Sequence, residues 1–250
     1  MPLLLLHTLG ARERTRRSNT QLGFTLAFVA GAVNAGGFLA VHRYTSHMTG
    51  FISAIADNLV LGQLALALAA AAFLAAFTAG AASTAILVNW ARHRELHSEY
   101  ALPLALESLL LLAFGLLGPN LDILVALFVP TTVMLLCFIM GLQNAVITKI
   151  SRAEIRTTHM TGVVTDIGIE IGRAAYFHGA GTRNPGRVDG GRLRILGAIL
   201  ALFLFGGVAG AAAFKAFGFF AVLPIAALLI AIAASPLIAD LRTLIRAAQR

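Results

Sequence analysis

The stretch Thr45-Ser46-His47-Met48-Thr49-Gly50 occurs a second time as Thr157-Thr158-His159-Met160-Thr161-Gly162, with Thr in place of Ser as the single change. A related segment precedes each copy, Gly31-Ala-Val-Asn34-Ala35 or Gly141-Leu-Gln-Asn144-Ala145. The second copy has two more residues between its asparagine and its histidine. The two units lie almost half the chain apart, so the sequence indicates that one half of the protein is a duplicate of the other.

The composition is that of a membrane protein. Hydrophobic residues make up 58% of the 250 residues and charged residues only 12%, with a mean hydropathy of +0.85. A soluble domain has about 25% charged residues. The formal net charge of +8 comes from arginines and lysines in segments between apolar runs, where they orient a protein and contact anionic headgroups. We therefore expect a lipid bilayer, and no nucleic acid, as the partner.

Six apolar runs are long enough to span a bilayer, which takes about 20 residues at 1.5 Å of rise per residue. They are 22–41, 64–90, 101–118, 123–147, 194–214 and 218–238. Two shorter runs, 48–61 and 159–174, begin at the repeated motif and carry acidic or amide residues. Runs of this kind are typical of half-helices that enter a membrane without crossing it.

The positive-inside rule favours six full spans over the alternative of seven or eight. With six spans, both termini and most basic loops are cytoplasmic, and only Arg43 and Lys215 are outside. We expect a basic tail over 1–21, a first repeat over 22–118, a second repeat over 119–238 and a second basic tail over 239–250. A mobile cytoplasmic loop is predicted over 176–193, which is rich in Gly and Arg. The predicted localisation is a bacterial inner membrane.

Because each half crosses the membrane three times, the second half has the opposite orientation in the membrane to the first. The prediction is therefore an all-α, polytopic helix bundle of two inverted three-span repeats, each with an added short half-helix. Inverted repeats are common in secondary transporters, whose sites lie between broken helices near the bilayer midplane. The small residues Gly206 and Gly210 are predicted to serve close helix packing.

The repeated motif is the candidate site for a small anionic or polar solute. A helix N-terminus carries unpaired N–H groups and a partial positive charge, and Thr45, Ser46, Thr157 and Thr158 are good residue types for capping it. An anion can satisfy the remaining amides. The alternative is that these residues only cap and pack two interrupted helices, and Asn34 and Asn144 either satisfy a helix break or face the solute. The candidate substrate-binding residues are Asn34, Thr45, His47, Thr49, Gly50, Asn144, Thr158, His159, Thr161 and Gly162.

Acidic residues in or near the apolar runs are candidates for proton or ion coupling, because ionising them in lipid is costly. Asp166 is one turn beyond the second motif and Glu107 lies within the third span, as a proton carrier or as an interfacial residue. Asp57 and Glu170 are near the ends of the short runs, where we expect them at headgroup level.

Two other classes of function remain open. One is a membrane-embedded enzyme that uses His47, His159 and Asp166; the chain has no recognised hydrolase spacing or paired metal motif. The other is a non-catalytic scaffold or sensor, and a homo-oligomer is possible in each case. No cofactor and no metal are expected, and an enzymatic activity is the less favoured prediction.

The paired units Gly-Ala-Val-Asn34-Ala-Gly-Gly-Phe with Thr45–Gly50, and Gly-Leu-Gln-Asn144-Ala with Thr157–Gly162, resemble the YoaK-like family. These are bacterial membrane proteins known as a domain of unknown function. The resemblance covers about residues 22–238 and implies a multi-pass inner-membrane protein. It implies no substrate.

Overall fold

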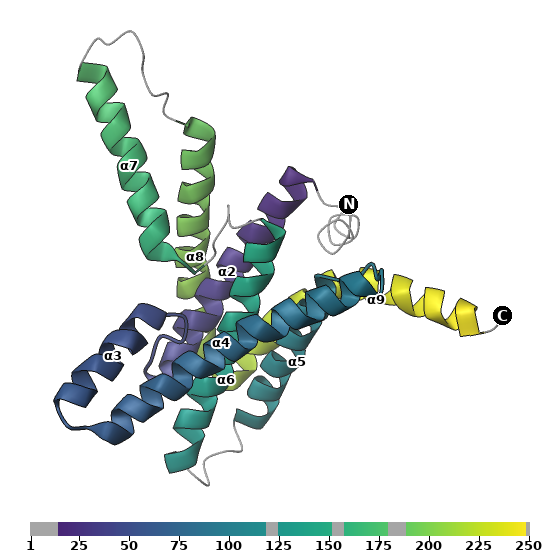
Figure 1. Cartoon of the computed structure of the whole chain (residues 1–250), viewed down its shortest axis with the longest axis horizontal. Helices are drawn as coiled ribbons and strands as arrows, with labels where there is room; N and C mark the ends of the chain where they lie inside the picture. The colour runs from purple at the N-terminus through teal and green to yellow at the C-terminus, as the bar shows by residue number, and fades with distance from the viewer. Residues whose placement is uncertain (1–14, 119–124, 152–157, 180–188, 249–250) are drawn as a thin grey trace.

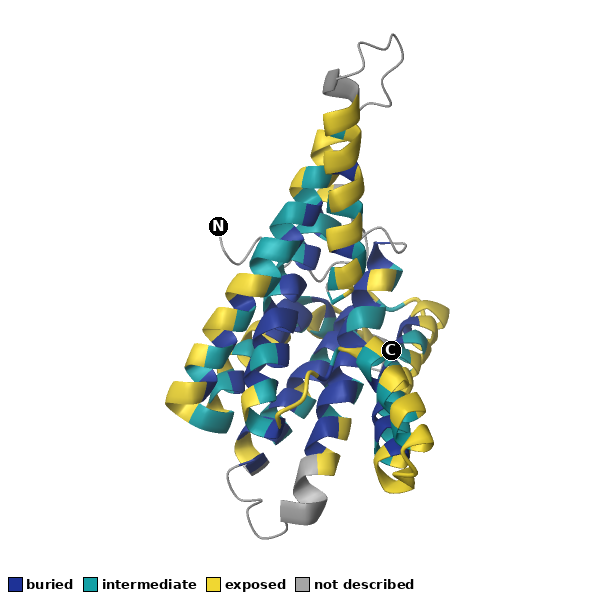
Figure 2. Ribbon diagram, turned by 90° about the vertical axis from the view of Figure 1, so that its left-hand side faces the viewer, coloured by how far each residue is buried: buried dark blue, intermediate teal, exposed yellow. Residues whose placement is uncertain are grey.

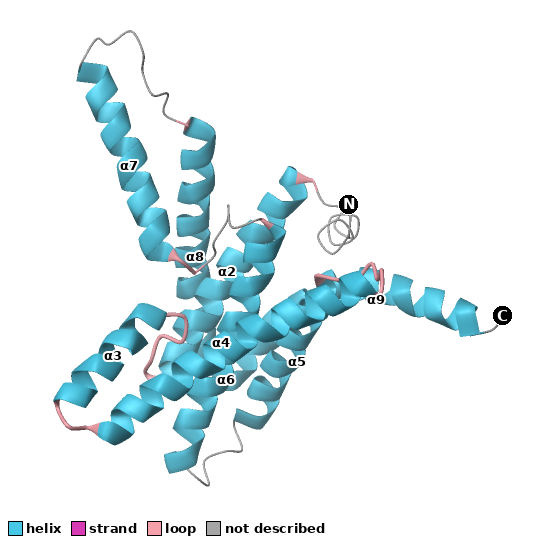
Figure 3. Cartoon of the chain, in the orientation of Figure 1, coloured by secondary structure: helices cyan, strands magenta, loops and turns pink. Residues whose placement is uncertain are grey.

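The computed structural model describes residues 15–118, 125–151, 158–179 and 189–248, and all regular structure in these ranges is helical (Figures 1 and 3). The first half contains α2 (Arg16–Val41), α3 (Met48–Val60), α4 (Leu64–His93) and α5 (Ala101–Leu117). The second half contains α6 (Val125–Ile150), α7 (Met160–Gly179), α8 (Gly190–Phe217), the 3-10 helix η3 (Gly218–Val222) and α9 (Leu223–Ala248).

Four helical stretches among the described residues are long and apolar enough to cross a bilayer, by length and composition. They are Arg17–Val41, Leu64–His93, Pro130–Ile150 and Gly190–Arg246. The last one contains two of the predicted spans, α8 and α9, joined through η3. Residues Met48–Val60 and Ala101–Leu116 form shorter apolar helices.

Several helices extend further than the sequence predicted. Helix α7 continues to Gly179 and α8 begins at Gly190, so part of the predicted loop 176–193 is helical, and 180–188 lie outside the described residues. The α8 extension has a local cause, because the side chain of Asp189 accepts a hydrogen bond from Arg192 N at 2.9 Å. Likewise α2 begins within the predicted tail, and α9 continues to Ala248.

The bundle is organised around two parallel helix pairs, α2 with α8 and α4 with α6, which form its most extensive helix contacts. Each of these four helices carries the sequence Phe-x-x-Gly: Phe28–Gly31, Phe77–Gly80, Phe138–Gly141 and Phe203–Gly206. In each pair, the glycine of one helix lies against the phenylalanine carbonyl of the other. A Cβ added at any of these four glycines would lie 2.0 Å from that carbonyl oxygen. Only glycine allows such an approach of two backbones.

The contacts along each pair run in the same direction. Gly206 meets Phe28 and Gly210 meets Ala32, while Gly80 meets Phe138 and Thr84 Oγ1 donates to Leu142 O at 3.0 Å. The predicted packing role of Gly206 and Gly210 agrees with these contacts. Both pairs therefore use the same crossing, and each joins a helix of one half to a helix of the other.

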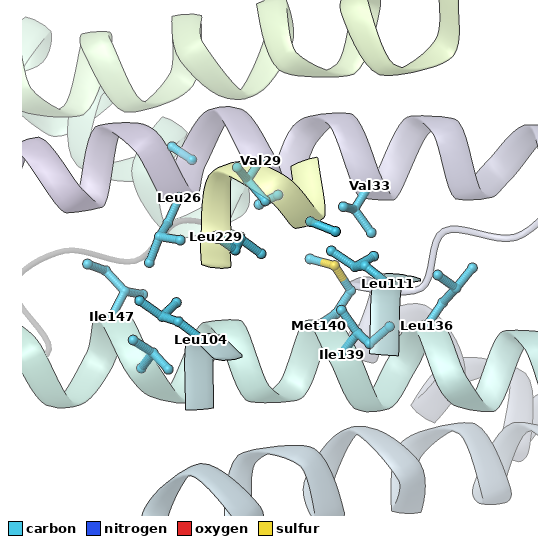
Figure 4. Close-up of a cluster of buried hydrophobic side chains, with 14 of the residues drawn as sticks. Leu26, Val29, Val33, Leu104, Leu111, Leu136, Ile139, Met140, Ile147 and Leu229 are labelled. Carbon is cyan, nitrogen blue, oxygen red and sulfur yellow. The ribbon is translucent and has the colours of Figure 1, made fainter. Parts of the chain in front are cut away.

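Helices α2 and α6 contact each other with opposite directions. Asn19 Nδ2 donates to Ile150 O at 3.2 Å, and Gln143 Nε2 donates to Leu26 O at 3.3 Å. Apolar side chains from α2, α5, α6 and α9 fill the space around this contact (Figure 4). Buried residues gather here, while the helices at the rim are largely exposed (Figure 2).

A polar cluster joins the end of α4, the start of α5 and the last turns of α9. Asp240 accepts hydrogen bonds from His97 N and Ser98 N, each at 2.9 Å. Arg92 forms an ion pair with Glu99 at 3.1 Å. These bonds hold three chain segments together at one end of the bundle.

Candidate functional site

The first copy of the motif lies in the turn between α2 and α3 and is tied to α2 by Asn34. Asn34 is buried, and its Oδ1 accepts hydrogen bonds from Ser46 N at 3.2 Å and from Ser46 Oγ at 3.0 Å. The amide thus satisfies backbone and hydroxyl groups where the helix is interrupted, as buried polar groups in an apolar environment require.

The second copy repeats this bond between α6 and α7. Thr158 Oγ1 donates to Asn144 Oδ1, and Asn144 Nδ2 donates to Met140 O of its own helix at 2.9 Å. Ser46 and Thr158 occupy the same position of the two motifs. The one residue that differs between the copies therefore keeps the hydroxyl that the bond needs.

The prediction that Thr45 and Ser46 cap the first short helix is wrong. The cap position of α3 is His47, which makes no side-chain capping bond, because the Ser46 hydroxyl is already bonded to Asn34. The Thr45 hydroxyl is fully buried and has no partner among the described residues. Helix α7 likewise begins at Met160, after His159; Thr157 lies outside the described residues.

In both copies the histidine ring folds back over the first turn of its own helix and covers the glycine three residues later. A Cβ added at Gly50 would lie 2.6 Å from His47 Nδ1, and one at Gly162 would lie 3.0 Å from His159 Nδ1. A side chain at either glycine would displace the imidazole from this position. The glycine provides the room in which the imidazole lies.

Four polar side chains of the motif are exposed: His47, Thr49, His159 and Thr161. Their side chains form no hydrogen bond with the rest of the described chain, in contrast to Asn34, Ser46, Asn144 and Thr158. The motif thus divides into an internal link, made by asparagine and hydroxyl, and a set of side chains that can bind a ligand.

The two short helices pack on different partners, α3 on α4 and α7 on α8. In the view of Figure 1 both helices begin towards the middle of the molecule and point away from it. Their N-terminal turns carry the amides that a helix leaves unpaired, and the side chains of His47, Thr49, His159 and Thr161 at these turns are exposed.

The acidic candidates have different surroundings. Asp166 is half-exposed and pairs with Arg192 of α8, with 2.8 Å between Oδ2 and Nη2. Glu170 is buried, pairs with Arg173 at 2.9 Å and accepts a hydrogen bond from Asp189 N at 3.3 Å. Asp57 is exposed near the end of α3.

Glu107 lies inside the helix bundle and not on its surface. Its side chain on α5 is 0% exposed, and neither carboxyl oxygen has a hydrogen-bond partner among the described residues. Gln143 on α6 is also 0% exposed, and its Oε1 has no partner in the same part of the chain. Gln143 is not among the predicted site residues, although a glutamine within an apolar run is a signal of a polar site.

Among the described residues, no three His, Cys, Asp or Glu side chains lie close enough together to hold an ion. The two histidines belong to separate helices that do not pack extensively on each other.

Comparison with known proteins identifies one family. A family model described as "Protein of unknown function (DUF1275)" matches residues 22–235. This match confirms the resemblance to an uncharacterised family that the paired motif indicated. No curated protein and no solved structure matches the chain.

Proposed function

The chain belongs to this DUF1275 family of proteins of unknown function, and we propose that it is a secondary transporter for a small anionic or polar solute. The observation that carries the proposal is the duplicated polar unit. Each half ties an asparagine to the hydroxyl before a short helix and leaves a histidine and a threonine exposed at the start of that helix. Duplicated polar helix starts within a membrane bundle are typical of transporter sites.

The two halves form an inverted repeat in this proposal. The antiparallel contact of α2 with α6 supports it, because these helices carry the equivalent Asn34 and Asn144. The matching α2–α8 and α6–α4 crossings support it as well. A two-fold axis in the membrane plane relates equivalent helices of such repeats in opposite directions.

The solute binds between the two helix starts, near the bilayer midplane. His47, Thr49, His159 and Thr161 contact it together with the first-turn amides, which favour a negative or polar group. Gly50 and Gly162 leave the space that the imidazoles occupy. Asn34, Asn144 and Thr158 act by positioning, and the buried Thr45 hydroxyl completes the polar lining.

The protein lies in a bacterial inner membrane with six spans and both termini in the cytoplasm. The shared polar cluster of Arg92, Glu99, His97, Ser98 and Asp240 supports this topology, because it brings the α4–α5 loop to the same end as the last turns of α9. A basic loop and a basic tail on one side agree with the positive-inside rule.

Flux through the purified protein in liposomes tests the proposal. The assay measures uptake of a fixed panel of radiolabelled probes: acetate, inorganic phosphate, sulfate, glycine and glutamate. The double variant Thr49→Ala, Thr161→Ala removes two exposed hydroxyls and no internal hydrogen bond. We therefore expect a folded protein whose flux is at least tenfold lower than that of the wild type. The matched control is Thr165→Ala on α7, whose exposed hydroxyl bonds its own helix at Thr161 O.

The proposal fails if the double variant transports as well as the wild type, or if no probe moves faster than through empty liposomes. A loss of folding in the double variant would contradict the division of the motif into a linking set and a binding set. Thermal stability of each variant is therefore measured beside its flux.

A further inference from the structure

Three oxygen atoms in the centre of the bundle lack a partner among the described residues: both carboxyl oxygens of Glu107 and Oε1 of Gln143. The orientation of the Gln143 amide is set by its Nε2, which donates to Leu26 O at 3.3 Å. Its oxygen is therefore an acceptor without a donor. A buried acceptor without a donor is destabilising, and two such groups in one core require a common explanation.

The neighbours of Glu107 on α5 and of Gln143 on α6 indicate that these two residues share one level of the contact between the helices. Glu107 is one turn from both Leu104 and Leu111, and Gln143 is one turn from both Met140 and Ile147. Figure 4 shows Leu104 beside Ile147, and Leu111 beside Met140. The two helices thus run in opposite directions here, with the polar residues between these two apolar levels.

No described cation is available to neutralise Glu107 there. The titratable side chains on the elements packed around it lie towards the helix ends or are uncharged; they are Arg17 of α2, Arg92 and His93 of α4, Cys137 and Lys149 of α6, and Asp240, Arg242 and Arg246 of α9. Arg92 is paired with Glu99, and Asp240 is bonded at His97 and Ser98. An unpaired carboxylate among leucine and isoleucine side chains is too costly to persist.

We propose that Glu107 and Gln143 form a proton-binding site, in which the protonated Glu107 carboxyl donates a hydrogen bond to Gln143 Oε1. One proton then removes the buried charge and supplies the missing donor. Binding forms one O–H bond on Glu107 with a proton from water, and release reverses this step. The coupling role rests on the proposed transport: the site makes the proton the coupling ion, and solute movement is accompanied by protonation of Glu107.

Infrared spectroscopy of the purified protein in lipid nanodiscs tests the site without any transport assay. At neutral pH, carboxyl groups in contact with water are ionised, so a carbonyl-stretch band of an un-ionised carboxyl reports a buried one. We expect this band in the wild type and its loss in Glu107→Gln. In Gln143→Leu the band should shift to higher frequency, because the carboxyl loses its acceptor. The control Glu99→Gln alters a carboxylate that is paired with Arg92 and should leave the band unchanged.

The wild-type spectrum alone can overturn the site, so the test does not depend on the folding of a variant. Absence of the band at neutral pH would refute the site. Disappearance of the band on addition of sodium or potassium chloride would also refute it, because the site would then bind a metal ion. A band that persists in Glu107→Gln also refutes the assignment. Absence of the band together with normal solute flux would refute the proton-binding site but not the transporter proposal. A normal band without solute flux would refute the transporter proposal but not the proton-binding site.

Discussion

One of the four closest helix contacts among the described residues offers the sharpest test of the fold, through the substitution Gly206→Ala in α8. A Cβ at this position would lie 2.0 Å from Phe28 O and 2.8 Å from the carbonyl carbon of the same residue. Carbon and oxygen atoms in contact are about 3.3 Å apart, so α2 and α8 must separate by roughly 1.3 Å. Phe28 O is a backbone atom and cannot rotate away.

The expected cost is at the upper end of the range for overpacking, about 3 kcal/mol, because the separation weakens the most extensive helix contact of the bundle. Thermal unfolding of the purified protein in detergent, followed by circular dichroism and by gel filtration, measures it. The matched control is the neighbouring Gly207→Ala, whose added Cβ would lie 3.6 Å from Ala35 Cβ, an ordinary contact. Alanine also favours a helix over glycine by about 1 kcal/mol, so the control should be neutral or stabilising.

Equal melting temperatures for the two variants would refute the geometry of this crossing. A destabilised Gly207→Ala with an unaffected Gly206→Ala would show that α8 presents another face to α2. The adjacent positions share the same helix and the same residue type, so the difference between them isolates the contact.

Two further predictions concern polar links. Asp240→Ala should destabilise the protein by about 1–3 kcal/mol, because the amides of His97 and Ser98 lose their acceptor; a melting temperature equal to that of the wild type would contradict this role. Asn34→Leu and Asn144→Leu should each lower the melting temperature, since each removes the acceptor of the hydroxyl before a short helix. Proteolysis should then cut at the released turn, and an unchanged cleavage pattern would count against the link.

The helices themselves were predictable from the sequence, because the length of an apolar run in a membrane protein is set by bilayer thickness. The predicted runs 64–90 and 101–118 correspond closely to α4 and α5. The duplicated motif was equally visible, since its two copies share five of six letters. The apolar runs and the repeated motif are both local signals, because each consists of consecutive residues.

Other features depend on residues far apart in the chain. The pattern Phe-x-x-Gly is too short to stand out, and its meaning appears only when Gly31 meets Phe203 across two helices. The error at Ser46 has the same origin, because Asn34 competes for its hydroxyl from the preceding helix. The sequence left open whether Glu107 is a proton carrier or an interfacial residue, because the sequence of a short span does not show which of its faces is enclosed by other helices.

The exchange of partners between the halves has a consequence for assembly of the chain. Helix α2 has its principal contacts with α8 and α6, and α6 has its own with α4, α5 and α2. The first helix of each half is therefore covered by the other half. When only α2–α5 have been synthesised, the glycine face of α2 has no partner helix. This face is exposed to lipid until α8 is synthesised and packs against it.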